Sequence, residues 1–221
     1  MNNVENQRVS IYIDAGNFFH LVLKKLKVRE NDFDFEQLIQ FLAVGRPVIR
    51  EGKRFYVGTV REKRDNHETT LAMVHQTALF DRLIAIGGWK ILTSKLKTRI
   101  ERIVIDDRVV DYQRLLSLGI NEVEYQRSRE KGIDVKIAVD LMAGAIDNRY
   151  DTAVIISSDA DLIPAIDWVR NKKGKKVEYV GFSISATEQR KETKPTNTLL
   201  YNSDFHRILS ESDIRKFLKL S

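Results

Sequence analysis

The sequence contains no cysteine. Disulfide bonds and thiolate metal sites are therefore excluded, and because this composition suits a reducing compartment we expect a cytoplasmic protein. Long hydrophobic runs are also missing: the stretch from Ala153 to Ile156 is one of the longest and is far too short to cross a bilayer. Residues 1–8 are polar and lack the apolar stretch of a secretory signal. We therefore expect no membrane partner.

The length and charge of the chain set the next limits. Its 221 residues, 43% of them hydrophobic, fit one domain with an elaboration better than two independent domains. The net charge of +6 gives weak support for an anionic partner. Much of the positive charge lies in clusters at residues 24–29, 61–64, 95–99 and 172–176. Such a cluster is ordinarily a solvated helix end or loop rim, and contact with nucleic acid is the alternative.

Apolar periodicity predicts strands that alternate with helices. Strands are expected at 9–13, 54–60, 89–93, 152–157 and 176–182, and helices at 18–27, 35–44, 66–86, 133–146, 161–171 and 211–220. This alternation indicates an α/β fold with a mostly parallel sheet and helices on both faces. Segment 94–125 fits the pattern poorly; we expect strands there, with a hairpin turn near Asp106 and Asp107 and a short helix at 112–118.

Acidic residues follow two of the expected strands. Asp14 ends the first strand, and Asp159 and Asp161 follow the strand at 152–157. Ligands of parallel sheets bind beyond the carboxyl ends of the strands, so the three carboxylates converge if these strands are neighbours. Carboxylates that lie close together repel one another unless a cation lies between them. Their oxygen atoms suit Mg²⁺ or Mn²⁺ better than zinc, and these segments contain no histidine.

A fourth acidic candidate opens the helix expected at 133–146. Asp134 lies in its first turn, where it either joins the metal ligands or only complements the helix dipole. Asp140 lies six positions further on, about 120° around the helix, so it faces another direction. We expect Asp140 to support the site from behind or to form a buried salt bridge.

Several of these residues have structural alternatives. Asp161 is a natural cap for a helix with Pro164 in its first turn, and Asp159 could make only turn hydrogen bonds. Asn17 could orient a water or a carboxylate, or cap the first helix. Ser157 and Ser158 could donate hydrogen bonds to a phosphate or simply hold the turn.

With these segments in place, the chain resembles the NYN domain family, a branch of the PIN-like metal-dependent nucleases that includes the LabA-like proteins. The resemblance rests on ordered blocks of residues: Ile11 to Asn17, Lys131 to Val135 with Asp140 and Leu141, Ile155 to Asp161, and Gly174 to Phe182, ending near Ser203 to Phe205. It implies a Rossmann-like, three-layer α/β/α fold over residues 1–221. It also implies RNA cleavage with Mg²⁺ or Mn²⁺, with the acidic roles on Asp14, Asp134, Asp159 and Asp161.

The chain departs from the family pattern at two positions and in one segment. Ser158 replaces a glycine and Leu162 replaces a phenylalanine. The serine places a side chain where the backbone would approach a phosphate, which leaves the acids intact but puts activity in question. Segment 94–125 has no family motif, and we interpret it as an elaboration that selects the substrate.

Two functions remain open from the sequence. One is a metal-dependent ribonuclease with nucleic-acid contacts from Lys131, Lys172, Lys173 and Lys175; the other is a catalytically weak or inactive RNA-binding regulatory protein with the same fold. The apolar face of the last expected helix, with Ile214, Phe217 and Leu218, is interpreted as packing on its own domain, and a homodimer through it is the alternative.

Overall fold

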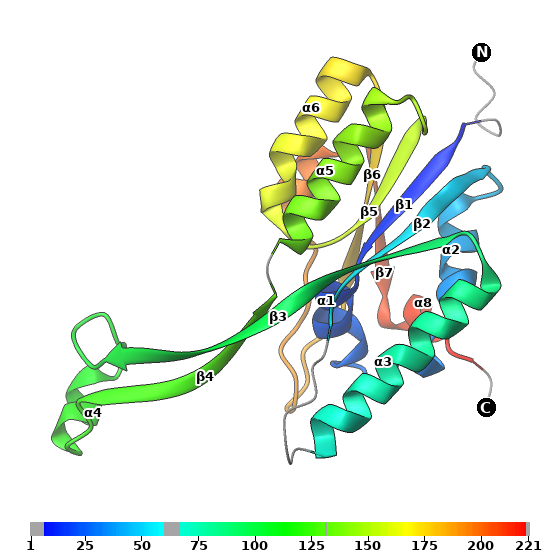
Figure 1. The fold of residues 1–221 in the computed structure, drawn as a ribbon. Helices are drawn as coiled ribbons and strands as arrows, with labels where there is room; N and C mark the ends of the chain where they lie inside the picture. Colours follow the sequence, from blue (N-terminus) through cyan, green and yellow to red (C-terminus); the bar gives the residue numbers. More distant parts are fainter. Residues whose placement is uncertain (1–6, 60–66, 131, 220–221) are drawn as a thin grey trace.

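Six parallel strands form the centre of the fold in a computed structural model, which describes residues 7–59, 67–130 and 132–219. The strands are β1 (Val9–Asp14), β2 (Val48–Thr59), β3 (Trp89–Val104), β5 (Thr152–Ile156), β6 (Lys176–Ser183) and β7 (Phe205–Ser210). A seventh, β4 (Glu122–Glu130), is antiparallel to β3, and the order is β4-β3-β2-β1-β5-β6-β7. The predicted mostly parallel α/β fold is confirmed, with β1 between β2 and β5 (Figure 1).

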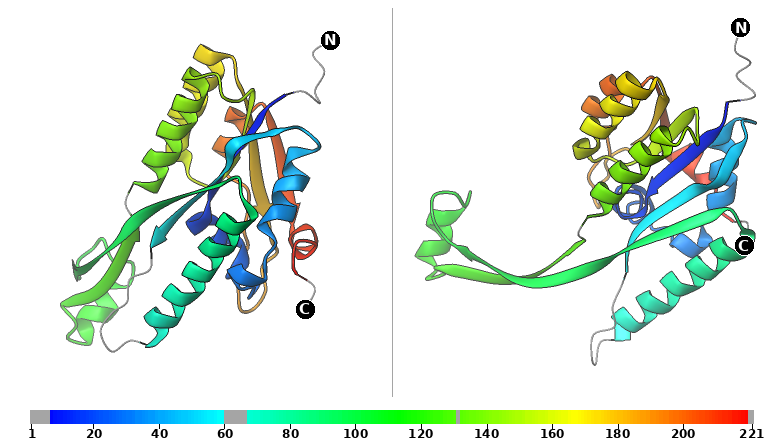
Figure 2. Two further views of the ribbon diagram at one scale, coloured as in Figure 1. Left: turned by 45° about the vertical axis from the view of Figure 1, so that its right-hand side comes forward. Right: turned by 45° about the horizontal axis from the view of Figure 1, so that its top comes forward.

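Helices cover both faces of this sheet (Figure 2). One face carries α2 (Phe35–Ala43), α3 (His67–Ile86), α8 (Glu211–Arg215), α1 (Ala15–Phe18) and a π-helix (Phe19–Leu23). The other face carries α5 (Ile133–Ile146), α6 (Ile163–Lys173) and α7 (Asn197–Asn202). Among the described residues, no helix has both the length and the apolar character that a membrane span requires. The three-layer arrangement leaves the carboxyl ends of the strands open at one edge.

The two faces of β1 explain why its sequence is continuously apolar. Ile11 and Ile13 pack into the core under α2 and α3, whereas Tyr12 packs into the core under α5 and α6. Alternate side chains of a strand point to opposite faces, so a strand covered on both sides has no solvated positions. β5 follows the same rule, and all of its residues are buried.

Most expected elements are present. The differences concern the bounds of some elements and two elements that were not predicted. Asp34 caps α2 as predicted by accepting a hydrogen bond from the backbone N–H of Gln37 at 3.0 Å. The single helix expected at 18–27 is instead the short α1 followed by the π-helix. The closing helix expected at 211–220 is shorter, and β7 and α7 were not predicted. Ile214 and Phe217 are buried, which confirms packing of this segment on its own domain.

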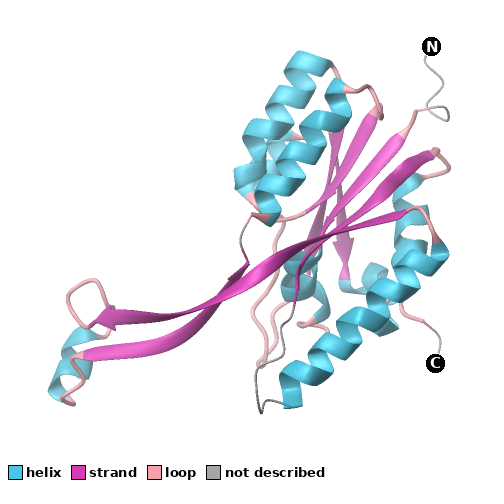
Figure 3. Ribbon diagram, in the orientation of Figure 1, coloured by secondary structure: helices cyan, strands magenta, loops and turns pink. Residues whose placement is uncertain are grey.

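Segment 94–125 forms an arm that extends beyond the sheet (Figures 1 and 3). β3 first pairs with β2 as far as Lys95, and from Leu96 to Val104 it pairs only with β4. The short helix expected at 112–118 is present as α4 (Tyr112–Ser117), at the far end of the arm. β4 returns toward the sheet edge and is followed by Gly132, whose φ of 78° lies in the left-handed region and turns the chain into α5.

Candidate active site

Three carboxylates meet at the open edge of the sheet. One carboxylate oxygen from each of Asp134, Asp159 and Asp161 lies within 4.8 Å of the others. Asp134 and Asp159 are partly buried, and Asp161 is exposed. Their donor set is oxygen only, and no ion pair joins any of the three to a cationic side chain within the described part of the chain. These properties fit a hard divalent cation such as Mg²⁺ or Mn²⁺.

Local structure explains the positions of Asp159 and Asp161. Asp159 caps a 3-10 turn (Ala160–Leu162) by accepting a 2.9 Å hydrogen bond from the backbone N–H of Asp161. The structure shows no side-chain cap at the start of α6, where Leu162 is the N-cap residue and Pro164 lies in the first turn. The alternative of Asp161 as the helix cap is therefore wrong, because the capping carboxylate is Asp159 and the capped element is the 3-10 turn.

Asp14 is not a member of this close group, and its oxygens already have partners. One oxygen accepts the backbone N–H of Asn17 at 3.0 Å, and the other accepts the Ser157 hydroxyl at 3.1 Å and the Asn17 side-chain amide. The Ser157 hydroxyl in turn accepts the backbone N–H of Asp159 at 3.1 Å. Asp14 is therefore connected to Asp159 through Ser157.

The environment of Asp14 also changes its acidity. Burial raises the pKa of the Asp14 carboxyl, the hydrogen bonds from Asn17 and Ser157 oppose that change, and the negative charge of Asp159 adds to it. Burial and a like charge both favour the protonated form. A nearby divalent cation would act in the opposite direction and favour the ionised form.

The small polar residues around Asp14 form one network. The Asn17 side-chain amide donates to Asp14, and the Ser158 hydroxyl donates a 2.6 Å hydrogen bond to the Asn17 side-chain oxygen, Oδ1. The Ser158 backbone carbonyl accepts a 3.1 Å bond from the Thr196 hydroxyl. The Ser158 side chain therefore points inward to Asn17. Asn17 therefore orients the Asp14 carboxylate. It does not cap α1, because the cap residue is Asp14.

Asp140, for which the sequence indicated no partner, forms a partly buried salt bridge with Arg54. Its Oδ2 accepts hydrogen bonds from Arg54 Nη1 and from the Tyr56 hydroxyl, both at 2.8 Å. Arg54 is only 3% exposed, so this contact joins α5 to β2 inside the protein. It holds the helix on which Asp134 lies.

The NYN domain family model matches residues 8–206, nearly the whole chain. The chain belongs to the NYN domain family. This family is PIN-like in fold and is generally one of nucleases, which act on nucleic acid. A solved protein of unknown function from Vibrio parahaemolyticus has a similar fold, with a TM-score of 0.52 and 15% identity over 95% of this chain and 96% of that chain. No match is found among curated proteins.

Three of the basic residues predicted to contact nucleic acid in this NYN domain, Lys172, Lys173 and Lys175, lie toward the amino edge of the sheet. Lys172 and Lys173 are exposed in the last turn of α6, which runs from the carboxyl edge to the amino edge of the sheet over about 16 Å. Lys175 contacts Asn148 and Asp151, which precede β5. Lys131 lies outside the described residues. Any nucleic-acid contacts of Lys172, Lys173 and Lys175 would therefore lie at the opposite edge of the sheet from the acidic group, and these contacts stay a prediction.

This NYN domain has another basic surface, which includes His20 near the start of the chain. We call it the basic cleft: a depression of about 580 Å³ whose cationic lining residues are Lys24, Lys25, Lys27, Arg190, Lys191 and Arg215. His20 also lines the cleft; burial and the positive charge of Lys24 lower the pKa of its imidazole, and the negative charge of Asp14 opposes that change. The sequence marked residues 24–29 as basic, but Arg190, Lys191 and Arg215 join them only in three dimensions.

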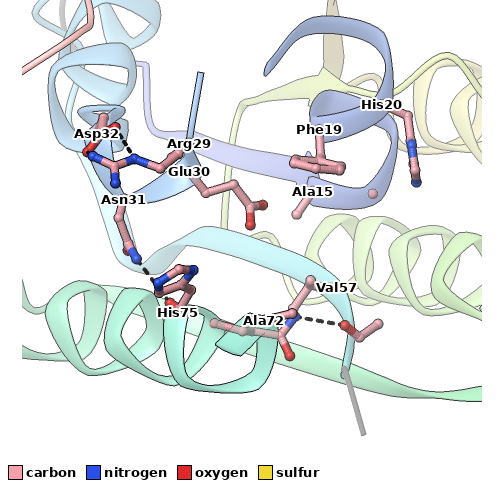
Figure 4. A pocket seen from close by; sticks show the side chains of 13 residues that line it. Ala15, Phe19, His20, Arg29, Glu30, Asn31, Asp32, Val57, Ala72 and His75 are labelled. Carbon is pink, nitrogen blue, oxygen red and sulfur yellow. Dashed lines mark hydrogen bonds and ion pairs between the residues drawn. The ribbon is translucent and has the colours of Figure 1, made fainter. Parts of the chain in front are cut away.

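A second depression, of about 540 Å³, adjoins Asp14 on the β2 side (Figure 4). Ala15, Phe19 and Val57 form apolar walls, and the Glu30 side chain extends into the space between them and His75. Burial raises the pKa of the Glu30 carboxyl to about 7. Nothing in the sequence distinguishes Glu30 from other loop acids, because its burial comes from segments distant in the chain.

Proposed function

We propose that this NYN domain is a ribonuclease that hydrolyses RNA phosphodiester bonds with Mg²⁺ or Mn²⁺. The observation that carries the proposal is the group of three carboxylates within 4.8 Å at the carboxyl edge of a parallel sheet. In a family that generally consists of nucleases, such a group has a direct chemical use. The finer placement within the LabA-like branch stays a prediction.

Each acidic residue has a separate role in the proposed mechanism. Asp134, Asp159 and Asp161 would hold the cation through their free oxygens. A bound Mg²⁺ or Mn²⁺ supplies a water of lowered pKa and neutralises charge on the phosphate oxygens. Asp14, through Ser157, orients the backbone of Asp159 and adds negative charge behind the site. Ser157 and Asn17 fix this orientation by hydrogen bonding.

The basic cleft is suited to hold the RNA backbone next to the cleavage point. The side chains of Lys24 and Lys191 form no hydrogen bond or ion pair with another residue in the described ranges, so their charges are available to phosphates. Arg215 is engaged by Glu211 at 2.7 Å and contributes less. Contacts of this kind give affinity without sequence selection.

The arm is proposed to select among substrates. Its shaft has nine paired positions, from Leu96 with Glu130 to Val104 with Glu122, and is therefore about 30 Å long. Arg99 and Arg127 are directly opposite each other in the shaft, and Asp134 follows the end of β4 by only a few residues. A strand of RNA leaving the site can lie along this arm, which would favour substrates long enough to reach it.

Cleavage assays with defined metals test the function. Labelled single-stranded RNA, hairpin RNA and matched DNA are incubated with the protein in Mg²⁺, Mn²⁺ or EDTA, beside Asp159→Asn and a control, Asp81→Asn. Asp81 is exposed on α3, away from the site. We expect cleavage of RNA with metal only, and at least about a hundredfold loss in Asp159→Asn but not in the control.

The alternative is a regulatory protein that binds RNA without cutting it. The basic cleft supports binding in either case, so salt dependence does not separate the two functions. Binding without cleavage in every metal would replace the nuclease proposal by the regulatory one. Cleavage that is equal in Asp159→Asn would remove the acidic group from the mechanism.

A further inference from the structure

The depression beside Asp14, which we call the Glu30 pocket, has the properties of a site for one small planar group. Its volume of about 540 Å³ lies within the usual range for small-ligand sites. The walls from Ala15, Phe19 and Val57 are apolar, and Figure 4 shows the Glu30 carboxylate extending toward Phe19 and Ala15. A flat apolar ligand with polar groups on one edge would satisfy both features.

Electrostatics exclude a phosphate from this pocket and favour hydrogen-bond donors. The Arg29 guanidinium is paired with Asp32 at 2.6 Å, and Figure 4 shows it directed away from Glu30. Arg82 donates to the backbone carbonyl of Asn31 at 2.6 Å, so its charge is also engaged. The Glu30 carboxylate has no hydrogen-bond or ion-pair partner within the described part of the chain. An ionised carboxylate only accepts hydrogen bonds, so a ligand that binds it must present hydrogen-bond donors, as the N–H groups of a base do.

The pocket is also close to the proposed cleavage site. Ala15 and Gly16 line it and directly follow Asp14, so their Cα atoms lie within about 8 Å of the Asp14 Cα. Val57 comes one position after Tyr56, the β2 partner of Asp14 in the sheet. A group bound here would therefore be attached to the RNA within a nucleotide or so of the bond that is cut.

We propose that the Glu30 pocket binds an unstacked guanine base of the RNA substrate, with Glu30 accepting hydrogen bonds from the Watson–Crick edge and Phe19 contacting the ring. Guanine presents N1–H and an exocyclic amino group side by side, which matches the two oxygens of a carboxylate. Uracil presents one N–H between two carbonyl oxygens, which the carboxylate repels. Proteins commonly read single-stranded RNA by such edge contacts and by stacking on aromatic side chains.

This inference rests on the proposed function, but it is tested by binding in EDTA, where no cleavage occurs. Fluorescence anisotropy compares an all-uridine strand with strands that carry one guanosine or one inosine, which lacks the amino group. We expect the guanosine strand to bind about tenfold more tightly than the all-uridine strand, with inosine between them. Cleavage with metal but no base preference would overturn the inference alone, and preference without cleavage would overturn the nuclease proposal alone.

Variants assign the preference to the pocket. Glu30→Gln keeps the shape but presents an amide N–H to one guanine donor, so the guanosine preference should fall to about twofold or less. Phe19→Leu should weaken binding of all strands alike, and Asp81→Asn should change nothing. Full guanosine preference in Glu30→Gln would overturn the assignment. Equal binding of all strands would overturn the proposal that the pocket takes guanine.

The pH dependence of binding adds an independent readout. Ionisation of Glu30 should increase the guanosine preference as pH rises from 6 to 8, because burial raises its pKa to about 7. His20, His75, Arg29, Asp32 and Arg82 are the other charged or titratable groups around the pocket. Because two histidines also line the pocket, the comparison is made against Glu30→Gln. An unchanged pH dependence in that variant would contradict the role of Glu30.

Discussion

Burial determines what individual acidic residues of this protein can do. Asp14 and Glu30 are both acids whose pKa is raised by desolvation, but their surroundings differ. Asp14 is held by Asn17 and Ser157, whereas Glu30 faces an open pocket. A desolvated carboxylate without partners costs stability when it is ionised. At Glu30 we therefore expect a conflict: the ionised carboxylate that would bind a ligand also lowers the stability of the ligand-free protein.

We predict that Glu30→Gln stabilises the ligand-free protein at high pH only. The pKa of Glu30 is about 7 in the folded protein against an ordinary 4.5, so its stabilising contribution is present at low pH and is lost as pH rises through this range. Glutamine does not ionise, so the variant keeps this stability at high pH. The difference in the free energy of unfolding is on the order of 1–3 kcal/mol for a partly exposed group. Thermal unfolding should show a higher Tm for the variant at pH 8 and nearly equal values at pH 4.5. Parallel pH profiles would contradict this prediction.

At the scale of elements, the contact between α5 and β2 positions the acidic group. Asp140 joins them by accepting from Arg54 and Tyr56, and Arg54 also lies over the Tyr12 ring at 5.7 Å. Arg54 Nε is buried and has no hydrogen-bond partner among the described residues. The guanidinium therefore depends on its remaining contacts, such as that with Asp140, to offset its lost hydration. Asp134 begins the same helix, so its position depends on this contact.

We predict that Asp140→Ala destabilises the protein by about 3 kcal/mol, because it leaves the Arg54 charge buried and unpaired. Urea unfolding measures the loss, and the double variant with Arg54→Met should recover most of it. The matched control is Asp147→Ala at the end of α5, where the pair with Arg149 is exposed and should contribute less than about 1 kcal/mol. Equal losses in the two single variants would show that the Arg54 contact does not hold α5.

At the scale of the whole molecule, the arm is the feature that least resembles a simple three-layer domain. It projects from the edge where the acids lie, and its end carries exposed apolar residues. Val110 is 98% exposed and Leu118 is 65% exposed. Ile214 and Phe217 of the C-terminal segment are buried against the rest of the chain. A homodimer through that apolar face is therefore not favoured, because the face is already covered.

We predict that shortening the arm changes substrate selection more than chemistry. Residues 97–129 are replaced by an Asn-Gly turn, which keeps the pairing of β3 with β2. The length of the arm, about 30 Å, sets the length of duplex that it can contact. KM for a hairpin longer than this should rise at least about tenfold, while kcat on a short single strand should stay within about twofold. Arg99→Gln with Arg127→Gln should reproduce part of the effect, and an equal change on both substrates would contradict substrate selection.

Much of the fold followed from local sequence. The buried runs of β1 and β5 and the periodicity of α5 predicted their elements closely, because these patterns arise from neighbours within a few residues. The position of Asp14, Asp159 and Asp161 after strands predicted the site, because parallel strands end at one edge. The family resemblance, now confirmed, came from the same blocks of residues.

Tertiary structure decided which of these residues meet. Asp14 uses its oxygens on Asn17 and Ser157, while Asp134 comes from beyond the arm to join Asp159 and Asp161. The lysines of α6 lie at the opposite edge, and the basic cleft is assembled from three separate segments. The physical reason is the separation of the interacting residues along the sequence. Strand and helix patterns depend on residues close in sequence, whereas these contacts join segments that are often more than a hundred residues apart.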